Sequence, residues 1–131
     1  MFRSVLGTTG REDRLLIVYN DTRLQMIEHF ELHRINSLRN VRSSLVARLR
    51  LRSTGQEFLF MVNHLWRGSE RGRHKQAQKL NDWARGQSLP VIAVGDYNFD
   101  WDVTDGDSDH DEGYDLLTDD GVFQWTRPAQ L

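Results

Sequence analysis

Residues 57–96 limit the possible folds more than any other part of the sequence. The apolar run Phe58-Leu59-Phe60-Met61-Val62 is followed by an amphipathic stretch over residues 69–85, and then by a second apolar run, Val91-Ile92-Ala93-Val94. Ser69 is a candidate N-cap for a helix and Gly86 a candidate stop. The pattern predicts a β-α-β unit with a right-handed connection and two parallel strands, the second of them buried on both faces.

Further elements are expected on both sides of this unit. Residues 14–19 predict a buried strand, residues 24–35 extended structure, and residues 44–52 a half-exposed strand that forms a hairpin with 57–62 through a Gly-containing connection at 53–56. After the unit, residues 100–112 predict a loop, 114–117 a helical turn and 122–125 a short strand. We expect a single α/β domain over residues 1–131.

Composition narrows the chemistry. The chain has no cysteine, so any metal must use oxygen or imidazole ligands. Residues 1–95 contain 16 Lys and Arg against 8 Asp and Glu, whereas residues 96–131 contain 1 against 11. A basic part suits a phosphate-bearing substrate and an acidic part suits divalent cations, but the two parts can also simply screen each other. No signal peptide or membrane-spanning run is visible, which predicts a soluble chain of unknown compartment.

Polar residues follow both strands of the β-α-β unit. Because parallel strands share their carboxyl edge, His64 and the segment Asp96-Tyr97-Asn98 are expected at one edge of the sheet, where open α/β folds place their sites. Asp96 and Asn98 are two residues apart, so an extended segment would point them to the same side. The sequence therefore predicts an imidazole, a carboxylate and an amide together.

These groups suit hydrolysis of a phosphodiester. His64 is a candidate to hold a phosphoryl oxygen, Asp96 to orient or deprotonate water, and Asn98 to stabilise the transition state. A hard divalent cation such as Mg²⁺, bound through carboxylate oxygens, would supply the largest charge.

The motifs Asn63-His64-Leu65, then Arg73 and Gln76 on a helix, then residues 90–98 (PVIAVGDYN) resemble the central block of the endonuclease/exonuclease/phosphatase superfamily, the deoxyribonuclease I-like fold. The resemblance implies part of a four-layer α/β sandwich with a mixed sheet and a flanking helix. It also implies Mg²⁺- or Mn²⁺-dependent cleavage of phosphate esters, with His64, Asp96 and Asn98 catalytic. Asp96 and Asn98 would be the metal ligands, and Arg42 would bind the substrate phosphate.

The sequence departs from the family pattern at both ends. The metal-binding glutamate expected nearer the N-terminus and the Asp-His pair expected nearer the C-terminus have no matching motif, so we expect a central fragment of a longer domain. Ser108-Asp109-His110 follows Asn98 by only ten residues and is interpreted as a coincidental match.

Two functions remain open from the sequence: a nuclease-like phosphodiester hydrolase acting on nucleic acid or another phosphodiester, or a catalytically incomplete binding or assembly module. Since a half-sandwich exposes one sheet face, the sequence also predicts a homo-oligomer.

Several other residues have two interpretations. The helix positions 71, 73, 75 and 79 carry Arg or Lys, which either contact a phosphate backbone or form a solvated face. Trp66 and Trp101 either contact substrate or pack. The Asp-x-Asp-x-Asp spacing at 105–109 is not a calcium loop of the EF-hand type, because His110 stands where Gly is needed and Leu116 where Glu is needed.

Overall fold

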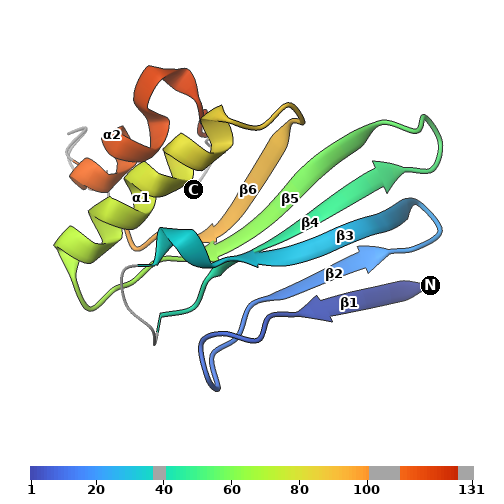
Figure 1. Cartoon of the computed structure of the whole chain (residues 1–131), viewed down its shortest axis with the longest axis horizontal. Helices are drawn as coiled ribbons and strands as arrows, with labels where there is room; N and C mark the ends of the chain where they lie inside the picture. Colours follow the sequence, from blue (N-terminus) through green and yellow to red (C-terminus); the bar gives the residue numbers. More distant parts are fainter. Residues whose placement is uncertain (37–40, 101–109, 127–131) are drawn as a thin grey trace.

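The computed structural model describes residues 1–36, 41–100 and 110–126 (Figure 1). Its elements follow the chain in this order: β1 Phe2–Leu6, β2 Leu16–Asn20, β3 Leu24–Leu32, the 3₁₀ turn η1 His33–Ile35, β4 Ser44–Leu51, β5 Glu57–His64, α1 Glu70–Arg85, β6 Val91–Asp96, α2 Glu112–Thr118 and the 3₁₀ turn η2 Asp119–Gly121.

The main sheet has four strands in the order β3-β4-β5-β6. Strand β4 pairs antiparallel with both β3 and β5, while β5 and β6 are parallel and are connected by α1. Gly55, in the β4–β5 turn, has a φ of 74°, which glycine adopts without the steric cost of a side chain. The predicted β-α-β unit and the predicted hairpin are both confirmed.

Helices cover one face of this sheet. Ser69 caps α1 by accepting a hydrogen bond from the Gly72 N–H, and Gly86 follows the last helical residue, as the sequence predicts. The helix buries Ala77, Leu80 and Trp83 against a core that includes Met61 of β5, and α2 packs beside α1. These contacts give the α/β layer its apolar core.

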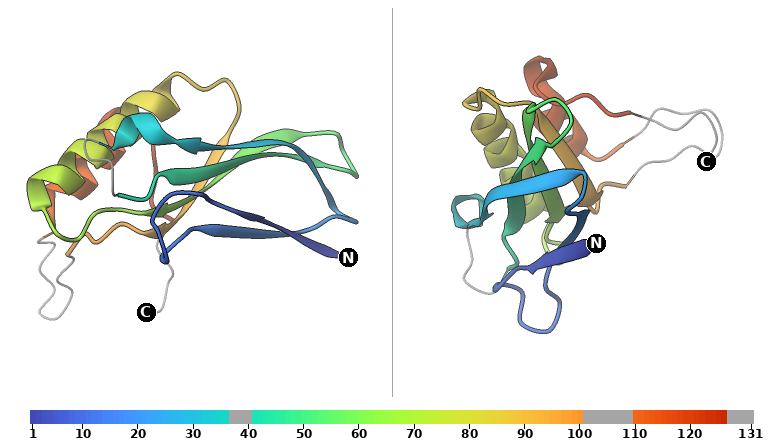
Figure 2. Two further views of the ribbon diagram at one scale, coloured as in Figure 1. Left: turned by 60° about the horizontal axis from the view of Figure 1, so that its bottom comes forward. Right: turned by 90° about the vertical axis from the view of Figure 1, so that its right-hand side faces the viewer.

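The opposite face is covered in part by a second, two-stranded sheet. Strands β1 and β2 pair antiparallel, and Leu15, Ile17 and Val5 pack against the β4 residues Leu45, Ala47 and Leu49. Helices and the β1–β2 hairpin therefore lie on opposite sides of the main sheet (Figure 2). The arrangement is α/β and corresponds to part of a four-layer sandwich.

Three burial predictions are wrong. Strand β4 was expected to be half-exposed, but it is buried at 44–47 and 49, because Val46 faces the helical core while Leu45, Ala47 and Leu49 face the β1–β2 hairpin.

Strand β6 was expected to be buried on both faces, but Ile92 and Val94 are 48% and 39% exposed because β6 is the outermost strand of the main sheet and the hairpin does not reach it. Strand β2 was also expected to be buried, but Leu16 and Val18 are exposed because the described residues cover only one face of the hairpin. Both strands are apolar on a face that the described part of the chain leaves open.

The last part of the chain is more helical than the sequence indicates. The predicted turn at 114–117 lies inside α2, which begins at Glu112 within the predicted loop. The short strand predicted over 122–125 is wrong, since these residues adopt no regular structure after η2. Trp101 and the motifs at 105–109 lie outside the described residues. Within the described ranges, no helix is long and apolar enough to cross a membrane.

Candidate active site

The carboxyl edge of the main sheet brings His64 and Asp96 together. They are the last residues of β5 and β6 and are register partners in the parallel ladder. The His64 Nε2 and Asp96 Oδ2 atoms are 3.9 Å apart, beyond the range of a hydrogen bond. The His64 side chain is 31% exposed and the Asp96 side chain 62% exposed. Both groups are therefore fixed in position by the ladder and still open to solvent.

Asn98 reaches the same edge by a different route from the predicted one. The chain does not stay extended after Asp96, because Asn98 adopts a φ of 53°. Its backbone N–H donates to Asp96 Oδ1 at 2.8 Å, and its side-chain Nδ2 donates to the carbonyl oxygen of Leu65 at 2.8 Å. A turn stabilised by the Asp96 carboxylate thus attaches Asn98 to the end of β5.

Gly95 makes the close approach of β5 and β6 possible. Its φ is 131°, a conformation that side chains rarely adopt, and a Cβ atom placed there would lie 2.8 Å from both the backbone N and the backbone C of Asn63. Only glycine lets the two strands meet one residue before the pair formed by His64 and Asp96.

A hydrogen-bond network that includes buried residues lies beneath this edge. Ser44 Oγ donates to Asn63 Oδ1, and Asn63 Nδ2 donates to the Tyr97 hydroxyl at 3.1 Å. Burial raises the pKa of Tyr97, and the hydrogen bond from Asn63 only partly opposes this. This network links β4, β5 and the segment after β6. Sequence reasoning did not find it, although polar residues at apolar positions of two strands were a usable signal.

Gln76 of α1 fixes the segment that follows His64. Its Oε1 atom accepts from the backbone N–H of Trp66 at 2.8 Å, and its Nε2 donates to Asn36 Oδ1 at 2.9 Å. The Trp66 ring packs over Gly72, where a Cβ atom would lie 2.5 Å from Cε3 of that ring. This contact supports the packing interpretation of Trp66.

Arg42 contacts Asp13, which is not one of the three edge residues. Its guanidinium forms an ion pair with Asp13 and donates from Nη1 to the Asp13 carbonyl oxygen at 3.1 Å. Arg42 precedes Ser44, the first residue of β4, so it lies at the same end of the sheet as His64. Its role in phosphate binding stays a prediction.

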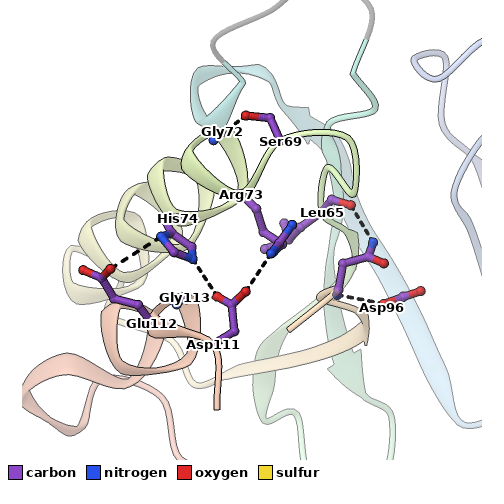
Figure 3. A network of polar contacts seen from close by, with 10 residues as sticks. Leu65, Ser69, Gly72, Arg73, His74, Asp96, Asp111, Glu112 and Gly113 are labelled. Carbon is purple, nitrogen blue, oxygen red and sulfur yellow. Dashed lines mark hydrogen bonds and ion pairs between the residues drawn. The ribbon is translucent and has the colours of Figure 1, made fainter. Parts of the chain in front are cut away.

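Arg73 fits neither interpretation of the basic helix positions, that is, contact with a phosphate backbone or a solvated face. Its Nη2 donates to Asp111 Oδ2 at 2.6 Å, and only 8% of its side chain is exposed, whereas Arg71 and Lys75 are exposed (Figure 3). Burial acts to raise the pKa of Asp111, but hydrogen bonds from Arg73, the Gly113 N–H and His74 outweigh it and lower that pKa. Arg73 is thus neither solvated nor free to bind a phosphate backbone with Nη2.

The described residues fall short of a complete metal site. A cavity of about 540 Å³ beside the edge is lined by Asp96, Asn98, Asp100 and Glu70 among others. Within the described ranges, however, no group of three His, Asp or Glu side chains is arranged to hold a metal ion. Asp96 and Asn98 offer oxygen ligands of the kind that Mg²⁺ prefers, but two ligands leave most of its coordination to water or a substrate phosphate. No catalytic step is therefore assigned to a metal held by these residues alone.

Glu31, one of the few carboxylates N-terminal to the β-α-β unit, is hydrogen-bonded to a neighbouring loop. Its oxygens accept from the Thr8 hydroxyl, the Thr9 N–H at 2.9 Å and the Thr9 hydroxyl at 2.5 Å. Burial acts to raise the pKa of Glu31, but these hydrogen bonds together lower it from 4.5 to about 2. Glu31 anchors the loop between β1 and β2 to β3.

Solved structures with this arrangement are known. An endonuclease/exonuclease/phosphatase family protein from Bacteroides thetaiotaomicron matches 88% of this chain with a TM-score of 0.63 and 21% identity. A mannosyl-6-phosphatase from the same species matches 88% with a TM-score of 0.61 and 22% identity. D. rerio TDP2 in complex with a single-stranded DNA product matches 74% with a TM-score of 0.60 and 20% identity. The chain has the endonuclease/exonuclease/phosphatase fold.

The match covers only part of those proteins. This chain spans 44%, 47% and 39% of their respective lengths. No family profile and no curated protein matches the sequence. The endonuclease/exonuclease/phosphatase fold is therefore established from structure, and the predicted correspondence to part of a longer domain agrees with the shares covered.

Proposed function

We propose that this chain supplies the His-Asp-Asn part of the active site of a metal-dependent phosphodiester hydrolase. The observation that carries the proposal is the register pair of His64 and Asp96 at the carboxyl edge, with Asn98 bonded to both strand ends. The fold agrees with the proposal, since the matched proteins include a phosphatase and a DNA-binding protein. Nucleic acid or another phosphodiester is the proposed substrate class.

Each side chain has a chemical role that its geometry permits. His64 is not hydrogen-bonded to Asp96, so its imidazole can donate to a phosphoryl oxygen. Asp96 accepts from Asn98 with Oδ1 and its side chain is 62% exposed, so Oδ2 can accept from an attacking water. The Asn98 NH₂ group donates one hydrogen to Leu65 and has a second to offer a phosphoryl oxygen.

The proposed metal, Mg²⁺ or Mn²⁺, needs ligands beyond Asp96 and Asn98. A divalent cation would neutralise charge developing on the phosphoryl group. Because the described residues do not complete its coordination, we propose that the substrate phosphate and water supply the remaining ligands.

A catalytically incomplete binding or assembly module is the second candidate. The specific observation in its favour is that Glu31 is held by Thr8 and Thr9 and that, in the described ranges, no three His, Asp or Glu side chains are grouped to hold a metal ion. Such a module would keep the fold and the edge geometry without turnover.

The test is cleavage of plasmid DNA and of a chromogenic phosphodiester by the purified chain with Mg²⁺, with Mn²⁺ and with EDTA. His64→Ala and Asp96→Asn are expected to lower the rate by at least about 100-fold, since each removes a group that contacts the reacting atoms. Matched controls are His29→Ala and Asp82→Asn, two exposed positions outside the edge that are expected to keep the wild-type rate.

The outcomes separate the two candidates. Metal-dependent cleavage that is lost in both site variants and kept in both controls supports the hydrolase. Cleavage that survives His64→Ala and Asp96→Asn contradicts the assigned roles. A folded wild-type chain with no cleavage favours the incomplete module.

Self-association, predicted from the sequence, is also a proposal. The exposed side chains of Ile92 and Val94 provide an apolar strip for a second copy. Sedimentation velocity at tens of micromolar tests this. A dimer that Ile92→Lys dissociates and Val18→Lys does not would support it, and a compact wild-type monomer would contradict it.

A further inference from the structure

The ion pair between Arg73 and Asp111 is almost fully removed from water. The two side chains are 8% and 7% exposed, and Asp111 also accepts from His74 Nε2 at 2.7 Å and from the Gly113 N–H at 2.7 Å (Figure 3). Burying two charges costs desolvation energy, so such a pair adds little net stability but defines relative position well. The ion pair therefore fixes α1 relative to the segment around Asp111.

Asp111 joins the two ends of the segment that follows Asn98. Its backbone N–H donates to the carbonyl oxygen of Asp100 at 2.9 Å, while its side chain is bonded to Arg73 of α1. The ion pair thus fixes the position of Asp100, two residues after Asn98, relative to α1.

The start of α2 adds a second restraint through Phe99. A Cβ atom placed on Gly113 would lie 2.8 Å from Cδ1 of the Phe99 ring, so the helix backbone packs directly on that ring. Phe99 also contacts Tyr97, with ring centroids 5.7 Å apart. The residues on both sides of Asn98 are therefore held by packing.

Asn98 needs such restraint because its backbone is in the left-handed region, at a φ of 53°. This conformation is unfavourable for a residue with a side chain, although Asn tolerates it better than most. Arg73, Asn98 and Phe99 line the same cavity of about 540 Å³. Arg73 of the ion pair and the strained Asn98 thus line one cavity.

We infer that Arg73 and Asp111 are positioning residues for Asn98. The ion pair sets Asp111, Asp111 sets Asp100 and the start of α2, and these together hold Phe99 and Asn98 in the observed turn. The consequence for catalysis rests on the proposed function; the positioning itself does not.

The experiment measures hydrogen exchange and amide chemical shifts of Asn98 by NMR on the full chain. Arg73→Lys and Asp111→Asn weaken the ion pair. Gly113→Ala places a methyl group 2.8 Å from both Cδ1 of Phe99 and Oδ1 of Asp111, so it disturbs the ring and the Asp111 carboxylate together. All three are expected to speed exchange of the Asn98 backbone N–H by at least about tenfold and to shift its signals.

Arg85→Lys is the matched control. Arg85 also lies on α1 and also pairs with downstream carboxylates, those of Asp119 and Asp120, but this cluster is exposed and does not line the cavity. In the Arg85→Lys variant, we expect the hydrogen exchange rate of the Asn98 backbone N–H to stay within about twofold of wild type.

The inference is overturned if folded Arg73→Lys and Gly113→Ala both keep wild-type shifts and exchange at Asn98. If Asp111→Asn does not fold, the other two variants still decide the matter. Should the chain hydrolyse phosphodiesters, the three variants are expected to lower kcat and leave KM unchanged. A chain without turnover refutes the proposed function and leaves the exchange result valid.

Discussion

Gly95→Ala tests how closely β5 and β6 must approach at the candidate site. The added methyl group would collide with the carbonyl oxygen of Asn63 and lie 2.8 Å from two further backbone atoms of that residue. Backbone atoms in a ladder cannot rotate away, so the strands must separate at the step before His64 and Asp96. The substitution therefore combines conformational strain with a loss of strand pairing.

The magnitude follows from two contributions. A side chain at a φ of 131° costs about 1–3 kcal/mol. Opening the end of the ladder costs about another 1 kcal/mol through a lost backbone hydrogen bond. The sum is about 2–4 kcal/mol. With a urea m-value of about 1.5 kcal/mol/M for a chain of this size, the unfolding midpoint is expected to fall by about 1–3 M.

Gly55→Ala separates the two contributions. Gly55 also has a positive φ, of 74°, but a Cβ atom there meets nothing within 4 Å. It should lose only about 1–2 kcal/mol from strain. Urea unfolding followed by tryptophan fluorescence measures both variants. If Gly95→Ala is no more destabilising than Gly55→Ala, the close approach of β6 to Asn63 does not limit the site, and the reasoning is refuted.

Three further predictions concern other parts of the molecule. The pKa of Glu31, about 2 in the folded chain against 4.5 ordinarily, means that its stabilising effect is present above pH 4.5 and is lost as pH falls toward 2. The difference in urea midpoint between wild type and Glu31→Gln should therefore shrink over that window, and a constant difference would contradict it. Asn81 donates from Nδ2 to the carbonyl oxygens of Leu117 at 2.9 Å and Asp119 at 3.0 Å. We expect Asn81→Ala to lower the free energy of unfolding by about 2–3 kcal/mol and Asp82→Ala, at an exposed position, to lower it by less than about 0.5 kcal/mol. Equal urea midpoints for the two variants would show that these hydrogen bonds do not stabilise the fold. Because the described residues bring together no three His, Asp or Glu side chains for a metal, we expect 1 mM Mg²⁺ to stabilise the chain by less than about 0.5 kcal/mol in thermal unfolding. A larger effect that Asp96→Asn abolishes would reveal a complete site.

The parts predicted correctly from sequence depend on local periodicity and simple topology. The spacing of apolar residues defined α1, and the rule that parallel strands share an edge placed His64 beside Asp96. Strand β1 was missed because Phe2–Leu6 is short and mixes apolar with polar residues. Its pairing with β2 is a tertiary contact that no local pattern reports.

The remaining errors come from interactions distant in sequence. Arg73 looks like a surface residue until Asp111, 38 positions later, is brought against it. Ile92 and Val94 look buried because apolar composition reports the tendency to be covered and not the presence of a covering layer. The edge position of Asn98 was predicted correctly, but the segment was expected to be extended, whereas it turns because the Asp96 carboxylate accepts from the Asn98 N–H.

The open edge of β6 has a consequence for how the chain behaves in concentrated solution. Natural proteins usually guard such edges with lysine, proline or a bulge, but Val91-Ile92-Ala93-Val94 carries no charge, and the strand has no neighbour on its outer side among residues 1–36, 41–100 and 110–126. The N–H and C=O groups on that side pair with no strand among those residues and form a template on which another extended segment can add. The yield of soluble chain on refolding is therefore set by concentration, because correct folding is first-order and strand addition between chains is second-order.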